Sequence, residues 1–182
     1  MAYVLEAVVA RDEVLRAVSR ELAESEAGVG AGAAVVPLAQ GLALMPMTDR
    51  LFDAVTDGGD GGDGGRDGHS GAEGSMGFWR LPKGFDGRLA QWSAVGPVAY
   101  VEAEYFGGVG EQRAVVWADG AVVLGPLHKP EDRPWSSAGS PLSQALRRLG
   151  AVAGATGDEF QAVGLDRHRD TGGWLQVADD SP

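Results

Sequence analysis

The sequence contains no cysteine. This absence excludes disulfide bonds, thiolate metal sites and cysteine nucleophiles together. A chain without cysteine fits a reducing compartment, so we expect a cytoplasmic protein.

The chain also lacks segments of the kind that enter membranes. A signal peptide would begin with a basic region, which is missing from the N-terminal stretch MAYVLEAVVARDEVL. No window approaches the roughly 20 apolar residues that are needed to cross a bilayer. The sequence therefore predicts no membrane association.

Basic residues are scarce: 15 Lys and Arg stand against 26 Asp and Glu, which leaves a net charge of −11. Nucleic-acid backbones and anionic membranes are bound by clustered Lys and Arg. We therefore expect no nucleic-acid partner. A protein partner is compatible with the acidic charge, and a basic protein would be attracted by it.

Motifs of known catalytic sites are missing as well. There is no HxH or HExxH pattern for a metal, and no serine lies in a G-x-S-x-G elbow. The glycine run at residues 107–110 leads into a predicted strand, whereas a phosphate-binding loop leads into a helix. No cofactor is predicted, and an enzyme is the less favoured interpretation.

The clearest pattern that is present covers residues 98–125. Apolar residues and glutamates alternate over residues 99–105 with the period of two that is typical of a strand. A glycine-rich turn and then Asp119-Gly120, a pair that favours a type I′ hairpin, separate the next two apolar runs. These residues are predicted to form a three-strand antiparallel meander that ends at Gly125-Pro126. Two of the runs alternate poorly, so much of both sheet faces should be covered.

Further strands are predicted before the meander. Residues 3–10 form a mostly apolar run, and residues 34–47 favour a hairpin that turns at Gln40-Gly41. Consecutive strands joined by short turns favour an α+β fold. We predict a two-layer domain with a mainly antiparallel sheet and helices packed on it.

Helices are predicted from capping residues and apolar spacing. The strongest start is Ser140-Pro141, with a serine cap followed by proline at the first helical position. The C-terminal end after residue 163 is expected to be a charged loop. The other predicted helices follow Asp12 and Thr48 and cover residues 86–95 and 158–163.

One segment, residues 56–77, is predicted to be a flexible insert within a single domain spanning residues 1–182. Its sequence, TDGGDGGDGGRDGHSGAEGSMG, has Met76 as its only large apolar residue. A calcium loop is the alternative, because Asp57, Asp60 and Asp63 recur at every third position. Calcium-binding repeats need a nine-residue period with a large hydrophobe, and an EF-hand ends in glutamate. We therefore predict no metal site.

Two glutamates are the first candidates for chemistry. Glu102 and Glu104 are two positions apart on one strand, so their side chains share a face about 6–7 Å apart. Such a pair can act as acid and base or hold a divalent ion. The alternative is a solvated face, with Arg113 on the next strand neutralising one carboxylate.

Histidines offer the second set of candidates. His128 and His168 lie outside the insert, and a catalytic or metal site would require them to converge with a carboxylate. Their spacing does not require such convergence. A catalytic role for either residue therefore stays an open alternative.

Candidate binding residues are concentrated near the C-terminus. Arg167, His168 and Arg169 lie in a mixed-charge stretch, and Trp174 follows it. Arginine and tryptophan are enriched at the centres of protein interfaces, although a solvated loop would also explain this pattern. Trp79, just after the insert, is a further candidate, with packing at the rim of the core as its alternative.

These observations favour a non-catalytic cytosolic protein-binding or regulatory module. As a small, acidic, cysteine-free α+β chain without a catalytic signature, it resembles many bacterial accessory, immunity and regulatory proteins. This likeness involves no shared motif. An immunity-type inhibitor of a basic toxin would be one concrete form. Two alternatives remain: a small hydrolase or metal-dependent enzyme that uses Glu102, Glu104 and a histidine, and a homo-oligomeric structural protein that pairs through a sheet edge.

Overall fold

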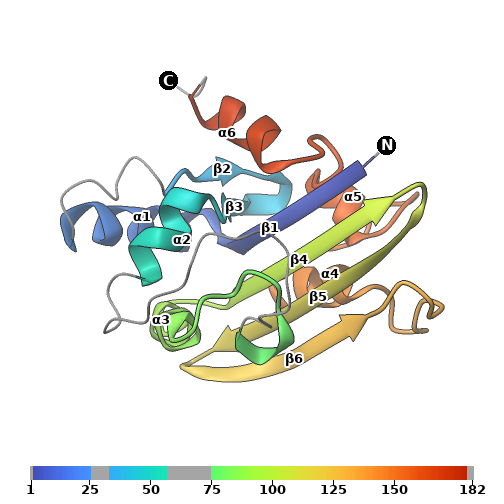
Figure 1. Cartoon of the computed structure of the whole chain (residues 1–182), viewed down its shortest axis with the longest axis horizontal. Coiled ribbons are helices and arrows are strands. Elements are labelled where there is room, and N and C mark those ends of the chain that lie inside the picture. Colours follow the sequence, from blue (N-terminus) through green and yellow to red (C-terminus); the bar gives the residue numbers. More distant parts are fainter. Residues whose placement is uncertain (1, 26–32, 57–74, 180–182) are drawn as a thin grey trace.

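A single antiparallel sheet forms the centre of the structure (Figure 1). The computed structural model describes residues 2–25, 33–56 and 75–179, and within them six strands pair in the order β2-β3-β1-β4-β5-β6. The strands are β1 (Ala2–Arg11), β2 (Val36–Pro37), β3 (Leu42–Pro46), β4 (Val98–Phe106), β5 (Val109–Ala118) and β6 (Ala121–Lys129).

Helices pack against both faces of this sheet. Their bounds are α1 (Asp12–Ser25), α2 (Asp49–Thr56), α3 (Phe85–Trp92), α4 (Pro141–Arg148), α5 (Glu159–Val163) and α6 (Thr171–Asp179), with short 3-10 helices η2 (Ala39–Gly41) and η3 (Ser75–Gly77). None of these described helices is long and apolar enough to span a bilayer.

Strand alternation produces a separate apolar core on each face. Val8 and Tyr100 belong to the core that α1, α2 and α3 cover, whereas their neighbours Val9 and Val101 belong to the core under α4, α5 and α6. Successive side chains on a strand point to opposite faces, so one apolar strand serves both cores. Because both faces are covered, β1 is a nearly continuous apolar run, and β4 is buried from Val98 to Ala103 even though it includes Glu102.

The predicted α+β fold, with a mainly antiparallel sheet and helices packed on it, is confirmed. The meander consists of β4, β5 and β6, and β2 and β3 form the predicted hairpin around η2. The third strand is longer than predicted, because β6 continues past Gly125-Pro126 to Lys129. The pairing of β6 with β5 shifts register between Ala114 and Trp117 of β5. Beyond the proline of β6, the two strands pair again as far as Lys129.

The C-terminal end, expected to be a loop, forms α6. The Asp170 Oδ1 atom accepts a hydrogen bond from the Gly173 backbone N–H at 2.8 Å, as a helix-capping residue does. Trp174 is buried on the inner side of the helix. Two successive glycines lower the helical propensity of this segment, and burial of the indole compensates for that loss.

Most of the predicted insert, residues 57–74, lies outside the described residues. Its flexibility therefore stays a prediction.

Candidate functional site

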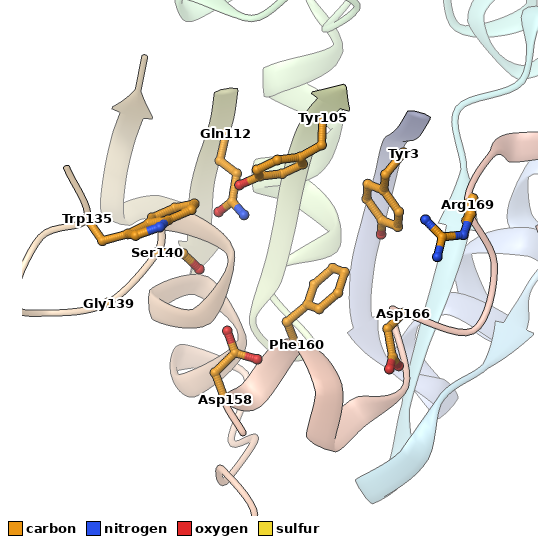
Figure 2. Close-up of a pocket in the computed structure, with 10 residues that line it drawn as sticks. All are labelled: Tyr3, Tyr105, Gln112, Trp135, Gly139, Ser140, Asp158, Phe160, Asp166 and Arg169. Atoms are coloured by element: carbon orange, nitrogen blue, oxygen red, sulfur yellow. The ribbon is translucent and has the colours of Figure 1, made fainter. Parts of the chain in front are cut away.

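A pocket of about 570 Å³ opens where β1 begins and β4 ends, on the sheet face covered by α4 and α5 (Figure 2). Ligand sites are typically concave, with apolar and aromatic walls and a few convergent polar groups. This pocket has both features. The residues lining it are Tyr3, Tyr105, Gln112, Trp135, Gly139, Ser140, Asp158, Phe160, Asp166 and Arg169.

Two tyrosines on paired strands form one wall. Tyr3 of β1 lies directly opposite Tyr105 of β4 in the sheet, and the ring centroids are 6.4 Å apart with the rings inclined by 65°. The Tyr3 hydroxyl donates a hydrogen bond to the carbonyl of Leu165 at 3.0 Å. The ring of Tyr3 is therefore held in place from both the sheet and the segment after α5.

The helix α5 supplies the floor of the pocket. Asp158 caps this helix by accepting a hydrogen bond from the Gln161 backbone N–H at 3.2 Å. The first turn carries Phe160, whose ring meets that of Tyr3 edge to face at 5.5 Å. Figure 2 shows the Asp158 carboxylate and the Phe160 ring both pointing into the pocket.

The loop after β6 forms the outer rim. Trp135 in this loop is 50% exposed, and its ring lies 6.4 Å from that of Tyr105 at an angle of 27°. The ammonium group of Lys129 lies 4.8 Å from the centre of the Trp135 ring. The indole is thus held by the sheet on one side while a large part of it faces solvent.

A neutral polar group lies at the back of the pocket. The Gln112 Oε1 atom accepts a hydrogen bond from the Leu142 backbone N–H at 3.1 Å, which ties β5 to the start of α4. Beside it, the Tyr105 hydroxyl makes no hydrogen bond of normal geometry to another described residue. Burial raises the pKa of Tyr105 to about 12, and the neighbouring Gln112 side chain opposes that rise.

Part of the predicted C-terminal binding cluster reaches this pocket. Arg169 lines it together with Asp166, and the Arg169 carbonyl accepts a hydrogen bond from the Val4 backbone N–H at 2.7 Å. That bond fixes the loop against β1. Among the described residues, neither the Arg169 guanidinium nor the Asp166 carboxylate has a hydrogen bond or ion pair, so both charges remain available at the rim.

The other members of that cluster hold the fold together. The Arg167 guanidinium donates hydrogen bonds to the carbonyls of Gly164 and Pro37 at 3.0 and 3.3 Å. His168 packs edge to face on Trp174 with ring centres 4.6 Å apart, and Trp174 is only 1% exposed. The Trp174 ring therefore belongs to the core and is not presented to a partner.

Glu102 does not lie on a solvated face, which corrects that interpretation of the glutamate pair. Its side chain is fully buried and accepts hydrogen bonds from the backbone N–H groups of Trp79 and Arg80, each at 2.7 Å, and from the Tyr100 hydroxyl at 3.2 Å. Burial raises the pKa of Glu102, and the two backbone hydrogen bonds oppose that rise. The carboxylate anchors the segment that follows the predicted insert.

Of the remaining catalytic candidates, Glu104 and His128 lie on the sheet face of Glu102 with Glu111 between them, and His168 does not. Glu104 is exposed, and His128 lies 3.2 Å from Glu111 on the same face of the sheet as Glu102. His168 lies on the opposite face, because it contacts Trp174 of the other core. No cluster of three or more metal-ligating side chains occurs among the described residues.

Trp79 is half-buried on the face opposite the pocket. The guanidinium carbon of Arg113 lies 4.0 Å from the centre of the Trp79 ring. Arg113 in turn pairs with Glu111 at 3.2 Å, so cation, ring and carboxylate form a local cluster. The Trp79 ring is engaged in this cluster.

Comparison with models of known protein families, with curated proteins and with solved structures finds no match for this chain. The pocket geometry is therefore the basis for the functional argument.

Most of the pocket residues could not be singled out from the sequence. Tyr3, Phe160 and Trp135 come from three segments that are distant in the chain, and none belongs to a motif. The one available signal is that Trp135 lies in a polar, proline-bearing loop. A large aromatic residue in such a loop is expected to be exposed, and exposed apolar residues can mark a binding site.

Proposed function

We propose that this chain is a non-catalytic cytosolic protein-binding module whose pocket receives a side chain of the partner. The observation that carries the proposal is the composition of the pocket. Tyrosine, tryptophan and arginine are the residues most enriched where binding energy concentrates in protein interfaces, and all three types line it. Trp135, half-exposed at the rim, is the residue that we expect to contribute most.

The pocket has two carboxylates, Asp158 and Asp166, but it lacks the partners that a serine nucleophile needs, which favours binding over catalysis. The lining residues include no histidine, and the hydroxyl of Ser140 accepts a hydrogen bond from the Ser143 backbone N–H at 3.0 Å as the cap of α4. A serine nucleophile needs a base within hydrogen-bond reach. The carboxylate of Glu102, a catalytic candidate from the sequence, lies on the other face of the sheet and accepts hydrogen bonds from the backbone N–H groups of Trp79 and Arg80.

The charge of the chain indicates what kind of protein would bind. A net charge of −11 attracts basic proteins and accelerates their association. We therefore expect a basic partner, and an inhibitor of the immunity type would be one example.

Self-association through the sheet edge has weaker support. The strand β6 is an open edge with Val122 and Val123 each 43% exposed. Its irregular pairing with β5 and its proline are features that discourage edge-to-edge pairing. We therefore place the partner at the pocket.

Affinity isolation tests this function. The tagged full chain would be recovered from the cells that produce it, beside Trp135→Ala and the control Val95→Ala, which changes an exposed apolar residue beyond the opposite end of β4. We expect a stoichiometric basic partner with wild type and Val95→Ala that is lost with Trp135→Ala. Recovery of no partner, or equal recovery with all three proteins, would contradict the proposal.

A further inference from the structure

The pocket presents aromatic faces to whatever enters it. Four rings converge from β1, β4, α5 and the loop after β6, namely those of Tyr3, Tyr105, Phe160 and Trp135 (Figure 2). The face of an aromatic ring carries partial negative charge and attracts cations. This chain already shows such a contact, because the Lys129 ammonium group lies 4.8 Å from the centre of the Trp135 ring.

A carboxylate lies below the two outermost rings. Figure 2 shows Asp158 pointing toward the space under Trp135 and Tyr105. Its oxygens accept hydrogen bonds from the Gln161 backbone N–H at 3.2 Å and the Ser143 hydroxyl at 3.3 Å. A carboxylate has about four acceptor sites, so two remain for an incoming donor.

The opposite side of the pocket carries one charge of each sign. Asp166 and Arg169 both lie on the side of Tyr3 in Figure 2. Burial raises the pKa of Tyr3, and the negative charge of Asp166 raises it further, so this carboxylate acts on the pocket wall. Two carboxylates thus face two cations, Arg169 on the side of Tyr3 and Lys129 beside Trp135, and Asp158 supplies the negative charge on the side away from Arg169.

We propose that the pocket binds a cationic side chain, arginine or lysine, of a basic partner protein, with its charged group against the open side of the Trp135 and Tyr105 rings and beside Asp158. This inference rests on the proposed protein-binding function and specifies its chemistry. The aromatic faces and the carboxylate both favour positive charge. Arg169 and Lys129 weaken such binding by like-charge repulsion.

Capped tripeptides provide the test. Peptides with a central arginine, lysine, citrulline, leucine or glutamate would be titrated into the full chain. Binding would be followed through the indole N–H resonance of Trp135, assigned with Trp135→Phe. Citrulline has nearly the shape of arginine without its charge. We expect the arginine peptide to bind at least ~10-fold more tightly than the citrulline peptide, a ratio that corresponds to about 1.4 kcal/mol.

Three variants test which charged residue controls the binding of the arginine peptide. Asp158→Asn keeps a good helix cap but removes the charge, and it should weaken arginine binding by about 10-fold. Asp53→Asn removes an exposed charge from α2 on the other face of the sheet, and it should change little. Arg169→Gln should tighten arginine binding, whereas a pocket built for an anion would lose its ligand.

The outcomes separate this inference from the proposed function. Equal binding of arginine and citrulline, preference for glutamate or leucine, or no binding of any peptide would overturn the cationic occupant. In that case, if wild type still captured a partner and Trp135→Ala did not, the protein-binding function would stand, but the occupant of the pocket would not be cationic. Selective arginine binding with no captured partner would support a cation site and contradict the protein-binding function.

Discussion

Glu6 and Glu102 lie directly opposite each other on β1 and β4, with the Glu6 side chain 15% exposed and Glu102 fully buried. Like charges in this position repel, and removal from water adds to the cost. The Arg80 guanidinium compensates in part, because its Nε atom lies 3.2 Å from a Glu6 oxygen. The two carboxylates thus hold the segment after the predicted insert against the sheet.

The free energy of unfolding should depend on pH through Glu6. Burial raises its pKa from 4.5 to about 7, with Arg80 opposing the rise and Glu102, Asp49 and Glu104 adding to it. The protonated form therefore contributes stability that is complete below pH 4.5 and is lost as the pH rises through 7. From about pH 5 to about pH 8, the free energy of unfolding of wild type should fall by roughly 1–3 kcal/mol relative to that of Glu6→Gln.

Urea unfolding of both proteins across this pH range checks the expectation. Glu21→Gln, an exposed change on α1, serves as the control and should track wild type at every pH. A constant difference between wild type and Glu6→Gln from pH 5 to pH 8 would show that Glu6 titrates near its ordinary pKa.

Glu102→Gln should destabilise the fold, because the new amide group would place a donor against the backbone N–H of Trp79 or Arg80. We expect a loss of about 1–3 kcal/mol, as for other buried donors left without an acceptor. Glu104→Gln, on the same strand but exposed, should stay within about 0.5 kcal/mol of wild type. Chemical denaturation measures both, and equal effects would contradict the anchoring role of Glu102.

Truncation should destabilise the protein far more at Trp174 than at Trp135. Trp174→Ala leaves a cavity in the core and should cost about 3–5 kcal/mol. Trp135→Ala should cost about 1 kcal/mol, since half of its surface is already exposed. Thermal unfolding and partner capture together distinguish the roles. If Trp174→Ala left stability unchanged, the core position of this indole would be wrong.

The two tyrosines of the pocket wall provide a matched pair. Tyr3→Phe removes the hydrogen bond to the Leu165 carbonyl and should cost about 0.5–1.5 kcal/mol. Tyr105→Phe removes a buried hydroxyl that lacks a hydrogen bond of normal geometry among the described residues, so it should be neutral or slightly stabilising. Urea midpoints compare the two, and a larger loss for Tyr105→Phe would reverse this assignment.

Local chemistry was sufficient to predict much of the fold. The strand predicted over residues 99–105, the Asp119-Gly120 turn and the Ser140-Pro141 helix start each depend on a few neighbouring residues, and the structure contains all three. The two ends that differ, β6 beyond Gly125 and α6, depend on contacts with distant partners. Pairing with β5 extends β6, and burial of Trp174 stabilises α6.

The sequence by itself determined the acidic charge, the absence of cysteine chemistry and the antiparallel α+β class. These follow from composition and from short-range geometry. Only the tertiary structure decided that Glu102 is buried, that Trp174 lies in the core, and that Tyr3, Tyr105, Trp135 and Phe160 surround one pocket. Strand register and loop anchoring bring these residues together across more than one hundred positions, as in the hydrogen bond from Tyr3 to Leu165, 162 residues away. No local pattern records such contacts, because they depend on the packing of the whole chain.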